Sequence, residues 1–156
     1  MNKQFWLFLF LIPSALYAGA QENMDYFLPD KVNYNRDIPT PEEFFHQNPG
    51  KWHLTHDQVL HYMQEIARIS ERAIIQEYAR SYENRPLVHV IFTSEENHKN
   101  LEKLKKLHYD YSEPESKIPI EKVPLVLTLG YGVHGNESSA TNSSVLTAYH
   151  LAAAQG

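Results

Sequence analysis

Apolar and polar residues recur with two different periods along the chain, and these periods predict an ordered series of helices and strands. A helix is expected to begin at Thr55, which together with Gln58 has the spacing of a capping box, and to continue to about residue 79. The end of this helix overlaps an alternating stretch, 74–82, that also suits a strand. We therefore expect the helix to yield to a strand near Ile75.

A β-hairpin and a second helix are predicted next. Residues 83–86 (Glu-Asn-Arg-Pro) form a turn signal between the alternating stretch and the β-rich apolar run 87–93. The helix is predicted over 94–108, where leucines recur every three residues and lysines occupy the other faces. Thr93 and Glu96 have the spacing of a capping box at its start.

The last third of the chain combines a polar loop, an apolar strand and a small-residue helix. The loop is expected over 109–122, followed by a continuous apolar strand, 123–130, of the kind that is buried on both faces. Gly130 and Gly132 allow close backbone approach at the end of this strand. Residues 138–155, rich in Ala, Ser, Thr and Leu, predict a buried helix. This order of elements predicts an α/β layer structure.

The N-terminal residues predict a secretory signal peptide followed by an arm. Residues 1–20 contain a short positive region, a mostly apolar stretch and a final Ala-Gly-Ala, which is typical of a signal peptide cleaved before Gln21. A membrane anchor is the alternative, but the apolar stretch is short for a span of about 20 residues. We expect a secreted or periplasmic protein without a stable membrane anchor. Residues 21–54, punctuated by prolines, predict an extended arm that packs on the domain formed by 55–156.

Composition narrows the function. The net charge is −5 with a pI near 6.0, so no basic surface favours nucleic acid as a partner. The chain has no cysteine, which excludes disulfides and thiolate metal ligands. A metal ion would therefore be held by histidines and carboxylates.

His134 and Glu137 are the strongest candidate metal ligands. They stand three residues apart in the sequence His-Gly-Asn-Glu, just after the predicted strand, and zinc accepts histidine nitrogen and carboxylate oxygen. In α/β sheets, sites lie beyond the carboxyl ends of strands. The spacing alone is a weak signal, and the alternative is a surface histidine beside a helix N-terminal glutamate. His53, His56 and His61 form a less well supported group, and the other histidines are isolated.

Two stretches together resemble the zinc carboxypeptidase family, the carboxypeptidase A-like metallopeptidases. Residues 81–87, Ser-Tyr-Glu-Asn-Arg-Pro-Leu, resemble the family hairpin S-x-E-G-R-P-[IL], with Asn84 in place of the usual glycine. Residues 125–137 resemble the apolar strand that leads into H-x-x-E. The resemblance covers about residues 55–155, roughly the first third of a family catalytic domain, and it implies the start of a mixed-sheet, phosphorylase/hydrolase-like α/β/α metallopeptidase fold, which is incomplete here.

The resemblance implies that His134 and Glu137 are the first two ligands of a catalytic Zn²⁺ and that the substrate is a peptide or protein. Asn136 departs from the animal digestive enzymes, which carry arginine there, and this leaves specificity open. The third zinc ligand, the carboxylate-binding arginines and the general-base glutamate have no matching position and are expected beyond Gly156. We therefore expect an incomplete domain that binds zinc weakly and does not hydrolyse peptides.

Two alternatives remain. One is a zinc-dependent deacylase of the succinylglutamate desuccinylase and aspartoacylase type, which shares the His-Gly-Asn-Glu sequence. Those enzymes are usually cytoplasmic and lack the hairpin motif, so the signal peptide and residues 82–87 argue against this assignment. The other alternative is a non-catalytic secreted binding module that keeps the two ligands.

Overall fold

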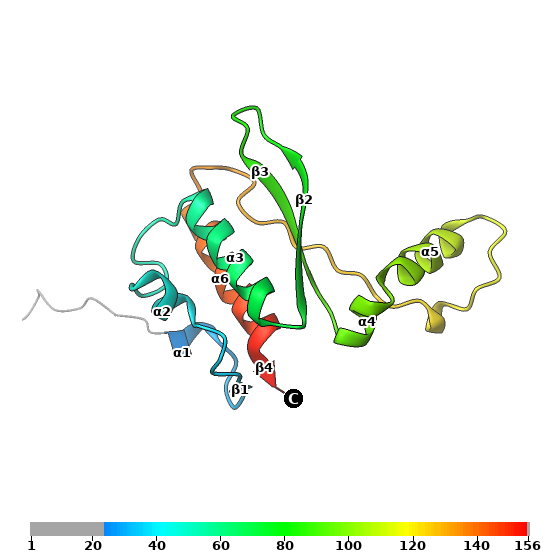
Figure 1. The fold of residues 1–156 in the computed structure, drawn as a ribbon, viewed down its shortest axis with the longest axis horizontal. Helices are drawn as coiled ribbons and strands as arrows, with labels where there is room; N and C mark the ends of the chain where they lie inside the picture. Colours follow the sequence, from blue (N-terminus) through cyan, green and yellow to red (C-terminus); the bar gives the residue numbers. More distant parts are fainter. Residues whose placement is uncertain (1–23, 156) are drawn as a thin grey trace, which may run out of the picture.

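The computed structural model describes residues 24–155, so the predicted signal peptide, 1–20, lies outside the described residues. Helices and small antiparallel sheets make up this part of the chain, which is a mixed α/β structure (Figure 1). None of its helices has the length and apolar character needed to span a bilayer. In chain order the elements are α1 (Met24–Phe27), β1 (Asn33–Tyr34), α2 (Pro41–Phe45), α3 (His56–Ile69), β2 (Ala73–Arg80), β3 (Pro86–Phe92), α4 (Glu95–Lys99), α5 (Leu101–Ser112), the 3₁₀ helix η2 (Ile120–Lys122), α6 (Ser138–Ala153) and β4 (Ala154–Gln155).

The core lies between α3 and α6, which pack side by side next to the hairpin of β2 and β3 (Figure 1). At the start of α3, the Thr55 hydroxyl accepts a hydrogen bond from Gln58 N, and the Gln58 side chain accepts one from Thr55 N. The predicted capping box is thus confirmed. The helix then turns an apolar face inward, where Tyr62 and Ile66 are fully buried. The Tyr62 hydroxyl donates to the carbonyl of Pro39 at 2.9 Å, and burial raises its pKa.

Helix α3 ends at Ile69, earlier than its apolar spacing predicts. Ser70 closes it: its N–H donates to the Ile66 carbonyl at 2.8 Å, and its hydroxyl donates to the Ala152 carbonyl at 3.3 Å. From Ala73 onward the backbone pairs with β3 instead. Local helix propensity is a weak preference, and strand pairing overrides it here.

The predicted hairpin is confirmed. β2 and β3 pair antiparallel, beginning with Ala73 opposite Phe92. In the turn, Asn84 has a φ of 62°, the left-handed conformation that asparagine tolerates better than most residues. His56, the first residue of α3, donates from Nε2 to the carbonyl of Pro86 at 3.0 Å. This bond fixes the start of β3 against the N-terminus of α3.

Helix α6 confirms the predicted buried helix, although it ends two residues before the predicted boundary of 155. Small side chains let it lie close to α3. Its buried residues are Asn142, Ser144, Val145, Leu146, Ala148, Tyr149, Ala152 and Ala153. Beyond α6, strand β4 pairs antiparallel with β1, so the end of the helix is joined to the N-terminal segment.

The N-terminal segment, 21–54, is less extended than predicted, because it includes α1 and α2 within its described part. The helical start at α2 comes from a capping box between Thr40 and Glu43, followed by proline at the first helical position, where its missing N–H is not needed. Ile38 and Leu54 are buried in the core. The segment therefore packs on α3 and α6.

The helix predicted over 94–108 is two helices that meet at Asn100. The predicted capping box at Thr93 is wrong, because the Thr93 N–H donates to the carbonyl of Arg72, just before β2, and its hydroxyl accepts from the Asn97 side chain at 2.8 Å. Ser94 caps α4 instead, accepting from Asn97 N at 3.2 Å. α5 then continues into the predicted loop as far as Ser112. Neither helix contacts α3 or α6 extensively, and Figure 1 shows them apart from that pair.

The buried strand predicted over 123–130 is wrong. The chain is irregular there, and Leu125 and Leu127 are 83% and 75% exposed. A strand persists only where neighbouring strands take up its backbone donors and acceptors. Within the described residues this segment pairs with neither β2 nor β3. The apolar composition of these residues predicted a strand. Composition does not report whether a neighbouring strand is available, and none of the described strands pairs with this segment.

Candidate metal centre

The loop before α6 lies close to that helix at two points. Gly132 has a φ of 68°, which glycine adopts without steric cost. A Cβ at this position would lie 3.2 Å from Thr141 Oγ1, so the backbone passes close to the first turn of α6. One residue earlier, the hydroxyls of Tyr131 and Thr147 share a hydrogen bond of 2.9 Å. The loop therefore has a fixed course although no strand leads into it.

His134 and Glu137 lie together at the end of this loop. The Nδ1 of His134 is 3.1 Å from Oε1 of Glu137, and the backbone N–H of Glu137 donates to the His134 carbonyl at 3.0 Å. The two side chains are 67% and 58% exposed. Glu137 precedes Ser138, the first residue of α6, so its carboxylate lies at the positive end of the helix dipole. The structure thus brings the two sequence-predicted residues together, but at a turn and not at a strand end.

The separation of these atoms suits a shared metal ion. Two ligand atoms, each about 2.0 Å from a tetrahedral zinc, are about 3.3 Å apart. The 3.1 Å between His134 Nδ1 and Glu137 Oε1 is close to that value. A proton between His134 Nδ1 and Glu137 Oε1 makes the hydrogen bond that joins them. A metal ion that binds both atoms takes the place of this proton, because it binds the unprotonated nitrogen and the carboxylate. The donor types and their spacing therefore fit zinc.

The other histidines do not add to this pair. Within residues 24–155 no group of three or more His, Cys, Asp or Glu side chains gathers around one point. His56 is engaged with Pro86 and with Asp57, and His150 shares a hydrogen bond of 2.9 Å with Tyr34. The competing group of His53, His56 and His61 is therefore not brought together as a site.

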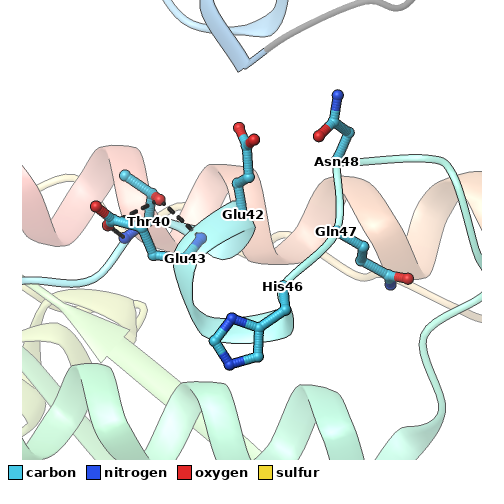
Figure 2. A pocket seen from close by; sticks show the side chains of 6 residues that line it. All are labelled: Thr40, Glu42, Glu43, His46, Gln47 and Asn48. Carbon is cyan, nitrogen blue, oxygen red and sulfur yellow. Dashed lines mark hydrogen bonds between the residues drawn. The ribbon is translucent and has the colours of Figure 1, made fainter.

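A hollow lies beside α2, away from this pair, and is lined by Thr40, Glu42, Glu43, His46, Gln47 and Asn48 (Figure 2). Glu43 is already engaged: its carboxylate accepts from Thr40 N at 2.8 Å, and this backbone hydrogen bond holds its pKa below the usual value. Figure 2 shows the side chains of Glu42 and His46 pointing away from each other. This hollow contains polar groups that do not converge on one ligand.

One buried polar residue near the site was not anticipated from the sequence. Asn142 lies in α6, and its side-chain oxygen accepts from Leu54 N at 3.1 Å while its Nδ2 donates to the Trp52 carbonyl at 2.8 Å. It therefore ties the segment before α3 to α6, the helix that begins at Ser138. The available signal was an amide in a helix otherwise rich in alanine, serine and threonine. Tyr131 gave no signal beyond its position between two glycines.

Comparison with protein-family models, curated proteins and solved structures gave no match to this chain.

Proposed function

We propose that this chain is the N-terminal part of a secreted zinc metallocarboxypeptidase and that His134 and Glu137 are its first two zinc ligands. The observation that carries the proposal is the 3.1 Å separation of His134 Nδ1 and Glu137 Oε1 on an exposed turn. The resemblance of residues 81–87 to the family hairpin supports the assignment to peptidases over deacylases. The proposed substrate is the C-terminal part of a peptide or protein.

Each residue has a distinct part in holding the metal. His134 binds through Nδ1, the ring nitrogen that faces Glu137, and Glu137 supplies an anionic oxygen. Tyr131 and Gly132 keep the loop close to α6, so the two ligands stay on the same side of the helix N-terminus. In a complete site of this class, zinc polarises the scissile carbonyl and lowers the pKa of a bound water.

The proposed fold is the start of a mixed-sheet α/β/α metallopeptidase domain. On this proposal the β2–β3 hairpin is its first pair of strands, and the apolar segment 123–130 pairs only when a neighbouring strand is present. On the same proposal, the groups that would use the metal, a third ligand and a general base, would come from residues outside this sequence. We therefore expect this chain to bind zinc without releasing amino acids from peptides.

The test is zinc binding by the purified chain, measured by equilibrium dialysis against zinc chloride. We expect His134→Ala and Glu137→Gln to lower the bound zinc strongly, because each removes one of two ligands. His61→Ala is the matched control, since His61 is an exposed histidine on α3 outside the pair. Equal zinc binding by wild type and both site variants would contradict the proposal.

The peptidase assignment needs a longer version of the chain. We expect residues beyond Gly156 to supply a histidine and a glutamate, and the longer protein to release C-terminal amino acids in a zinc-dependent way. A longer protein that binds zinc but leaves peptide C-termini intact would reject the peptidase assignment while keeping the metal site.

A further inference from the structure

We draw no further inference here: the strongest candidate, the exposed apolar surface of Leu125, Val126, Leu127 and Leu129 in the segment between η2 and α6, carries none, because nothing in the structure shows what covers it.

Discussion

The hydroxyl of Tyr131 lies 2.9 Å from the hydroxyl of Thr147, sixteen residues further along the chain. This hydrogen bond joins the loop that carries His134 to the third turn of α6, the helix that begins after Glu137. The two proposed ligands therefore belong to two segments that are tied together away from the ligands themselves. The relative placement of the two proposed zinc ligands depends on this tie as well as on the short turn between the two residues.

Removing the tie should weaken zinc binding without unfolding the protein. A hydrogen bond contributes about 0.5–1.5 kcal/mol net, which corresponds to a change of about 2- to 12-fold in an equilibrium constant. We expect Tyr131→Phe to lower zinc affinity within that range in isothermal titration calorimetry, because the loop is then less well held. Tyr109→Phe, which changes an exposed tyrosine of α5, is the control. Equal affinities for the two variants would mean that the loop is fixed by other contacts.

Gly132 should not tolerate a side chain. Its φ of 68° is strained for other residues, and an added Cβ would approach Thr141 Oγ1 at 3.2 Å. We expect Gly132→Ala to lower the free energy of unfolding by about 1–2 kcal/mol, measured by urea denaturation, and to weaken zinc binding. Gly135→Ala is a sharp control in the same loop, because its Cβ would meet nothing within 4 Å. Similar losses in the two variants would contradict the close approach to α6.

Asn142 should be important for stability. Its side chain satisfies Leu54 N and the Trp52 carbonyl in or near the core. A buried polar group left without a partner costs about 1–3 kcal/mol, so we expect Asn142→Ala to reduce the free energy of unfolding by that amount in urea. Ser139→Ala, at an exposed position of the same helix, should leave it unchanged within about 0.5 kcal/mol. A stable Asn142→Ala would mean that water replaces the amide at no cost.

The stability contribution of Glu43 should depend on pH. The backbone hydrogen bond from Thr40 lowers the pKa of Glu43 in the folded state, so the carboxylate favours folding above its ordinary pKa. That contribution is lost as pH falls through the lowered pKa. We expect Glu43→Gln to be less stable than wild type at neutral pH by less than about 1 kcal/mol, because the group is exposed, and equally stable in strong acid. Thermal denaturation from pH 7 downward, with Glu42→Gln as control, measures this. A stability difference that does not change with pH would contradict the role of the charge.

Local signals in the sequence predicted most of the elements. The capping box of Thr55 and Gln58 located the start of α3 because its hydrogen bonds are made within one turn. The hairpin was predicted because alternation and a turn signal are also local, and Asn84 adopts the left-handed conformation that the turn requires. The buried face of α6 followed from its small residues.

The errors concern properties that depend on distant parts of the chain. Residues 123–130 have the composition of a buried strand, but a strand also needs a neighbour, which local composition does not report. Ser94, and not Thr93, caps the helix, and a long-range backbone bond joins Thr93 to Arg72 just beyond the hairpin. The spacing of His134 and Glu137 predicted that their side chains meet, whereas the tie through Tyr131 depends on how the loop crosses α6.

The most direct test of the central claim is a double-mutant cycle for zinc affinity on His134→Ala, Glu137→Gln and the variant with both changes. If both residues bind one ion, removing either ligand destroys the chelating pair, and we predict that the double variant binds zinc scarcely more weakly than either single variant. The losses would then be strongly non-additive. Losses that add in the double variant, or a single variant with unchanged affinity, would contradict the claim that these two residues hold the same metal ion.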